Sequence, residues 1–134
     1  MTEAIGAVRA APLALLDQGL LPEFRDEDWV QARQSELDTL ITELLELEAE
    51  AALEIGGSEL AAAERAANRL VERERYRESG YRLLMRVHAA RGNPAHATDV
   101  YESLRSLLLA DLGIPPAVET RRLYQQLLDP TDAG

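Results

Sequence analysis

Apolar residues recur at three- and four-residue steps along most of the chain, which is the period of an amphipathic α-helix. The longest such stretch runs from Trp29 to Ile55 without proline or glycine and predicts one long helix. We expect its apolar stripe to be the packing face; the stripe comprises Leu37, Leu40, Ile41, Leu44, Leu45, Ala51, Ala52 and Ile55. Acidic residues occupy the other face, and the stripe does not keep a heptad through Glu48 and Ala49, which disfavours a coiled coil.

Glycine and proline divide the rest of the chain into shorter helices. Gly56 and Gly57 end the long helix, and Ser58 suits the N-cap of the next. The turns predict helices over 59–73, 78–91, 95–112 and 117–128, separated by residues 74–77, by Gly92-Asn93-Pro94 and by Gly113 with Pro115 and Pro116. In the last helix, Val118, Leu123, Tyr124, Leu127 and Leu128 are expected to face inward.

The N-terminal part is less regular. A short helix is predicted over residues 4–17, where Pro12 would kink or split it, and residues 20–28 read as an ordered loop. Asp26 or Asp28 suits the N-cap of the long helix, and Trp29 is better explained as a packing anchor than as a ligand-stacking residue.

The helices have a repeating arrangement. Gly57 and Gly92 lie 35 residues apart, and each follows one helix and precedes another. This spacing is close to the tetratricopeptide period of about 34 residues. We therefore predict an all-α, tetratricopeptide-like short α-solenoid of antiparallel hairpins, with about six helices in a single domain over 1–134 and an ordered core over 4–128.

The charge distribution changes this picture. The net charge of −10 disfavours broad contact with a phosphate backbone. Residues 1–64 carry fifteen acids and three arginines, whereas residues 65–91 carry eight arginines and three acids, so an acidic body has a basic middle. The chain has no cysteine, no apolar run long enough for a membrane span and no secretory-signal pattern, so we expect a cytoplasmic protein without membrane contact.

Side chains from Tyr81 onward resemble the bacterial transcriptional activator domain, a tetratricopeptide-like module of actinobacterial antibiotic regulatory proteins and their relatives. The matching positions are Tyr81-Arg82, Leu84-Met85-Arg86, His88-Ala89, Gly92, Ala95, Ala97, Tyr101-Glu102, Leu104-Arg105, Leu107-Leu108, Asp111-Leu112-Gly113-Ile114, Pro116, Glu119-Thr120-Arg121, Leu123-Tyr124 and Leu128. Leu20-Leu21-Pro22, Trp29-Val30 and Arg33 resemble the family's entry segment. The chain departs at Pro115-Pro116-Ala117-Val118, where the family often has Asp-Pro-Ser-Pro.

The resemblance implies an all-α module that commonly follows a winged-helix DNA-binding domain and assists dimerisation and activation. DNA would then be contacted only through that separate domain, which this chain does not include. An excised fragment, a stand-alone module and a module of a different multidomain regulator all fit the sequence.

No motif indicates catalysis, a cofactor or a metal. Gly56-Gly57 lacks the further glycine and the lysine of a phosphate-binding loop. His88 and His96 lack a metal-ligand spacing and are better explained as packed or partly exposed helix residues. We therefore expect neither an enzyme nor a metal site.

The arginine-rich middle is the one candidate site. Its members are Arg65, Arg69, Arg73, Arg75, Arg77, Arg82 and Arg86. Guanidinium groups suit carboxylates and phosphates, so this segment predicts docking of an acidic partner, such as the acidic long helix of another subunit or a component of the transcription machinery. The alternative is local pairing with neighbouring glutamates.

These observations favour a non-catalytic interaction module of a bacterial transcriptional regulator that mediates self-association or contact with partner domains or the transcription machinery. The alternative is a generic tetratricopeptide-like scaffold of a different signalling protein, whose concave face holds an extended peptide.

Overall fold

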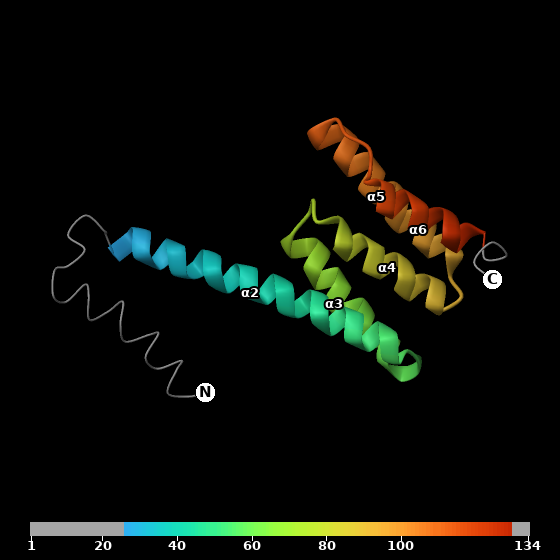
Figure 1. Ribbon diagram of the computed structural model, residues 1–134, viewed down its shortest axis with the longest axis horizontal. Coiled ribbons are helices and arrows are strands. Elements are labelled where there is room, and N and C mark those ends of the chain that lie inside the picture. Colours follow the sequence, from blue (N-terminus) through green and yellow to red (C-terminus); the bar gives the residue numbers. More distant parts are fainter. Residues whose placement is uncertain (1–25, 130–134) are drawn as a thin grey trace. The chain divides into compact units, whose positions relative to one another are not determined.

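The computed structural model describes residues 26–129, which form five α-helices and one 3-10 turn and no strand (Figure 1). The elements are α2 (Asp26–Ile55), η1 (Gly57–Glu59), α3 (Leu60–Arg73), α4 (Glu78–Ala90), α5 (Pro94–Leu112) and α6 (Val118–Leu128). The all-α prediction is confirmed, with five helices in this range rather than about six. The helix predicted over 4–17 lies outside the described residues.

The chain divides into two compact units, Met1–Thr39 and Leu40–Gly134, and α2 contributes to both. In the first unit, Trp29 is half-buried and the guanidinium carbon of Arg33 lies 5.6 Å from the centre of its ring. The second unit contains α3 to α6 and the second half of α2, and the following description concerns this unit.

The glycine and proline residues of the turns predicted the helix ends well. Gly92 and Gly113 adopt left-handed backbone angles, with φ of 75° and 67°, as expected for glycine after a helix. After α4, the amide of Asn93 donates to the carbonyl of His88 at 2.8 Å and the amide of Gly92 to that of Ala89 at 3.0 Å, which closes the helix end. Pro94 then occupies the first turn of α5, where its missing N–H costs nothing.

The predicted cap Ser58 is wrong, and so is Asp28, one of the two candidates for the cap of α2. Ser58 does not cap α3, because it lies inside the 3-10 turn and Glu59 precedes the helix without a side-chain capping bond. Asp28 does not cap α2, because that helix already begins at Asp26 and Asp28 lies within its first turn. Acidic residues in a first turn still stabilise the positive end of the helix dipole.

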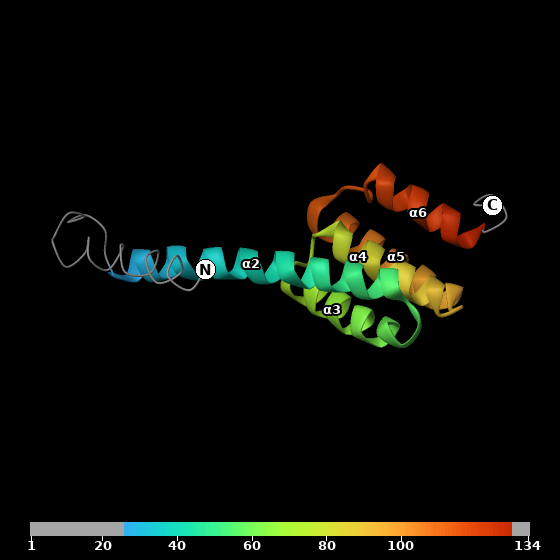
Figure 2. The same ribbon diagram turned by 60° about the horizontal axis from the view of Figure 1, so that its bottom comes forward.

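Helix α4 is the centre of the second unit, with α3 and α6 packed on it and not on each other (Figures 1 and 2). Four small apolar clusters each take a side chain from it. Leu83 and Leu84 pack with α2 and α3, Val87 with Ala52 and Ala63, Met85 with α5 and α6, and Tyr81 with α5. A helix buried on several sides in this way explains why Tyr81, Leu83, Leu84, Met85 and Val87 are all buried.

The predicted packing face of α2 is largely wrong. Leu45 and Ala52 are buried and Ile41 is half-buried, whereas Leu37, Leu40, Leu44 and Ile55 are exposed. The buried face consists of Thr42, Leu45, Ala49 and Ala52. Small side chains let α2 approach α3 and α4 closely, so the larger leucines lie away from the core.

The predicted inner face of α6 is only partly correct. Leu123 is buried and Tyr124 and Leu127 are half-buried, but Val118 and Leu128 are exposed. The rings of Tyr101 and Tyr124 stack in parallel with centroids 3.9 Å apart, which fixes α6 against α5.

Candidate functional site

The seven candidate arginines lie on three different parts of the second unit. Arg65, Arg69 and Arg73 are exposed on α3; Arg75 and Arg77 lie in the turn between α3 and α4; Arg82 and Arg86 lie on α4. Three of the seven reach three different helices, because Arg75 contacts α5, Arg77 contacts α2 and Arg82 contacts α6.

The two arginines of the turn bind acids of neighbouring helices. Arg77 donates to Glu46 of α2 at 2.7 Å and to the hydroxyl of Ser79 at 3.2 Å. Arg75 contacts Asp111 of α5 at 3.4 Å, and the Tyr76 hydroxyl donates to the same carboxylate at 2.9 Å. Burial alone would raise the pKa of Glu46, but hydrogen bonds from Ser79 and Arg77 outweigh it and hold this pKa below its ordinary value.

Arg82 belongs to a bonded group that holds the start of α6. Its guanidinium donates to the Thr120 hydroxyl at 2.9 Å and lies 3.7 Å from Glu119. Thr120 is fully buried and donates to Glu78 at 2.7 Å. Glu78 also accepts the backbone N–H of Ala117 at 2.9 Å. The carboxylate of α4 thus caps α6, because Ala117 precedes that helix and has no side chain able to do so.

A fourth ion pair joins α3 to the end of α4. Arg91 donates to Glu64 at 2.7 Å, and Nε2 of His88 lies 3.9 Å from the same carboxylate. The His88 and His96 rings meet edge to face with centroids 5.2 Å apart, and burial lowers the pKa of His88. Within residues 26–129, no group of three or more histidine or carboxylate side chains is placed to hold a metal ion.

Local pairing therefore accounts for Arg75, Arg77 and Arg82. Arg65, Arg69 and Arg86 make no ion pair with any described residue, and all three are exposed. Arg65 and Arg69 lie one turn apart on α3. Arg86 lies on α4 beside α6, where it borders a groove of about 430 Å³ together with Arg122, Val118 and Leu123.

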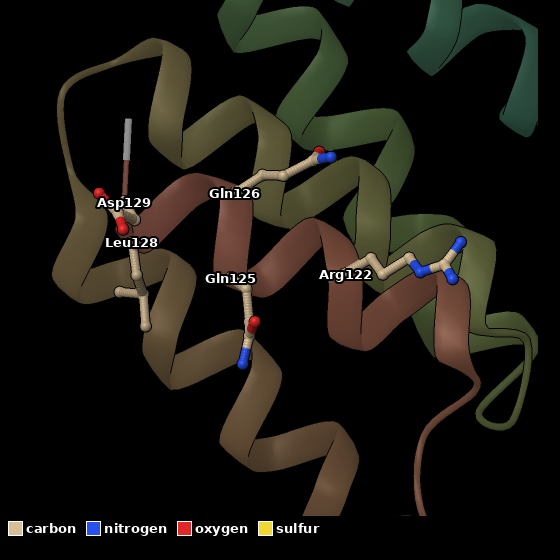
Figure 3. A pocket seen from close by; sticks show the side chains of 5 residues that line it. All are labelled: Arg122, Gln125, Gln126, Leu128 and Asp129. Atoms are coloured by element: carbon tan, nitrogen blue, oxygen red, sulfur yellow. The ribbon is translucent and has the colours of Figure 1, made fainter. Parts of the chain in front are cut away.

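Another hollow follows the last turns of α6, with a volume of about 510 Å³. Arg122, Gln125 and Gln126 leave the helix in different directions and do not converge on a common point, while Leu128 and Asp129 lie at its end (Figure 3). Groups that diverge in this way cannot hold a reacting atom between them, so this hollow has no catalytic arrangement.

Sequence reasoning missed an apolar surface on α2. We use the name α2 stripe for Leu40, Leu44, Leu47, Ala51 and Ile55, all of which are exposed. The leucines are 53%, 63% and 60% exposed in chain order, and Ile55 is 74% exposed. The signal was present in the sequence, because Ala49 and Ala52 with Thr42 and Leu45 form a second helical row of smaller residues.

Comparison with known proteins identifies a family. The model of the bacterial transcriptional activator domain matches residues 1–128. No curated protein and no solved structure gives a significant match. Within the part of the chain that the structure describes, no helix is both long and apolar enough to cross a membrane.

Proposed function

Because the chain belongs to the bacterial transcriptional activator domain family, we propose that it serves a transcriptional regulator as a non-catalytic module for protein contact. The contact is self-association, a partner domain of the regulator, or the transcription machinery. DNA is contacted by a separate domain, since a net charge of −10 is unsuited to a phosphate backbone.

The observation that carries this proposal is the pair of arginines on α3. Arg65 and Arg69 lie one turn apart on an exposed face and have no carboxylate partner among residues 26–129. Each exposed guanidinium group can bind a carboxylate of another molecule with two parallel hydrogen bonds. The partner surface is therefore acidic.

The test is a double charge reversal, Arg65→Glu with Arg69→Glu. We expect it to abolish self-association of the chain, measured by sedimentation velocity at low and moderate salt, and to abolish repression when the chain is fused to a DNA-binding domain that acts only as a dimer. The control is Arg105→Glu with Arg121→Glu, which changes the net charge equally on α5 and α6. If both variants behave as the parent in both assays, contact through α3 is excluded.

The groove between α4 and α6 supports a second candidate, the peptide-binding scaffold. Arg86 and Arg122 line it with Val118, Leu123, Gln126 and Glu119, so it offers two guanidinium groups against one carboxylate, together with apolar side chains, to an extended acidic segment. The pair Arg86→Gln with Arg122→Gln is expected to weaken binding of a synthetic acidic-apolar peptide by at least about tenfold. The matched pair Arg65→Gln with Arg69→Gln leaves that binding unchanged if the groove is the site.

A further inference from the structure

The α2 stripe is an apolar helix face that no described residue covers. Its leucines lie nearly opposite the buried row of Thr42, Leu45, Ala49 and Ala52, so they cannot contribute to the core of their own unit. Exposed leucines at neighbouring helical positions are typical of surfaces that bind another protein. The remaining question is which chemistry complements this face.

The spacing of the stripe identifies the shape of the partner. Leu40, Leu44, Leu47 and Ala51 follow each other at steps of four, three and four residues. This is the a and d pattern of a coiled coil, in which a second helix inserts side chains between those of the first. The residues that seemed to break the heptad, Glu48 and Ala49, lie beside the stripe and in the core, respectively.

The edges of the stripe identify the charge of the partner. Glu43 and Glu50 follow one edge and Glu48 the other, and all three are exposed. They occupy the positions that pair across a coiled coil, and none of them makes an ion pair with another described residue. No basic residue occurs between Arg33 and Arg65, so the second half of α2 has no positive charge.

From this pattern we propose that the α2 stripe binds a basic amphipathic helix of a partner protein. A second copy of α2 would place glutamates against glutamates along both edges, which opposes self-pairing. The chain's own first 25 residues hold two arginines and three acids, so they do not supply a basic helix either. The partner presents leucine-like residues at its own a and d positions and lysine or arginine at its edges.

This inference rests on the proposed role as an interaction module, but it uses a different surface from Arg65 and Arg69. The two can therefore fail separately. If the α3 variants have no effect, the proposal for the α2 stripe still stands. If no helix binds at α2, the proposal for the α3 contact still stands.

The experiment measures binding of two designed peptides to the full chain by fluorescence anisotropy. Both have three heptads with leucine at a and d; one has lysine at the edge positions and the other glutamate. We expect the lysine peptide to bind and the glutamate peptide not to bind. Raising the salt concentration from about 50 mM to about 500 mM should weaken the binding of the lysine peptide at least about fivefold, because exposed charges are screened.

Variants then locate the binding surface. The double variant Leu44→Gln with Leu47→Gln should weaken the binding of the lysine peptide at least about tenfold. Leu109→Gln with Leu112→Gln on α5 removes two leucines of comparable exposure, 63% and 49%, and should change binding less than about twofold. Reversal of Glu43, Glu48 and Glu50 to lysine should transfer the preference to the glutamate peptide. Equal binding of both peptides to the parent chain overturns the proposal.

A cysteine probe tests whether the face is open. The chain has no cysteine, so Leu47→Cys and Leu109→Cys each introduce a single thiol. The parent leucines at positions 47 and 109 are 60% and 63% exposed. The two introduced thiols should therefore react with a maleimide at rates within about twofold of each other. A rate at least about tenfold slower at position 47 overturns the proposal, because the face is then covered by the chain's own N-terminal segment or, if the rate depends on concentration, by a second copy.

Discussion

At the scale of single residues, Thr120 shows how a polar side chain becomes part of a core. Its hydroxyl donates to Glu78 and accepts from Arg82 while the residue is fully buried. A buried hydroxyl is tolerated only when its hydrogen bonds are made, and within the described residues no buried side-chain polar atom lacks a partner. The sequence placed Thr120 in the family motif but offered no sign of its partners, which lie 38 and 42 residues earlier in the chain.

Replacing Thr120 by valine keeps its shape and removes the hydroxyl. We expect a loss of about 1–3 kcal/mol in the free energy of unfolding, because Glu78 and Arg82 each lose a hydrogen bond at a site with little water. Urea denaturation measures the change. Thr98→Val on α5, at a half-buried position, is the control, and an equal effect of both substitutions would show that the bonded group adds nothing.

Glu46 makes stability depend on pH. Its pKa in the folded chain is below the ordinary value of 4.5, so the ionised group stabilises the fold above that pH and the contribution disappears as the pH falls through the lower folded value. We expect Glu46→Gln to lower the melting temperature at pH 7, and we expect the difference from the parent to be smaller at pH 3. A difference from the parent that is the same at both pH values contradicts the role of this ion pair.

At the scale of elements, the sequence predicted helix ends better than helix faces. Ends depend on local chemistry: Gly92, Pro94 and Gly113 adopt the backbone angles that their residue types favour. Faces depend on which neighbours exist. Along α2 two rows of residues satisfy the helical period, and the predicted stripe contained members of both. The row of Thr42, Leu45, Ala49 and Ala52 is the one that packs against α3 and α4, whereas the more hydrophobic row with Leu40, Leu44 and Ile55 is exposed.

Helix α4 should be the least tolerant element. Met85 is fully buried between α5 and α6, so Met85→Ala removes side-chain volume that its neighbours cannot refill and should cost about 2–5 kcal/mol. Leu109→Ala, at an exposed position of α5, should cost less than about 0.5 kcal/mol. Thermal or urea unfolding compares the two. Similar losses in both variants would contradict the central position of α4.

At the scale of the molecule, the second unit is held together through one helix. Each of the four apolar clusters formed by residues 26–129 includes a side chain of α4, while among the described helices α6 packs only on α4 and α5. The sequence identified the region from Tyr81 onward by its family resemblance and the arginine-rich segment as the candidate site. It could not show that three of those seven arginines bind acids on α2, α5 and α6, since these contacts join residues far apart in the chain.

This arrangement predicts the order in which the amides exchange with solvent. Those of α4 should exchange most slowly, through global unfolding, and those of α6 should exchange earlier, because that helix is bounded on fewer sides. Hydrogen exchange followed by mass spectrometry measures both helices in one experiment. Protection of α6 equal to that of α4 would show that the unit opens only as a whole.

The capping of α6 by Glu78 has a consequence for how this family can change over time. The start of a helix is normally stabilised by the residue just before it, so it can be altered by one local mutation. Here the stabilising group lies 39 residues upstream, and position 117 is alanine. Among relatives, a serine, threonine or aspartate at the position of Ala117 would accept N–H groups of the first turn, but the N–H of residue 117 itself would still need an acceptor such as Glu78. We therefore expect a carboxylate at the position of Glu78 whichever residue stands at position 117.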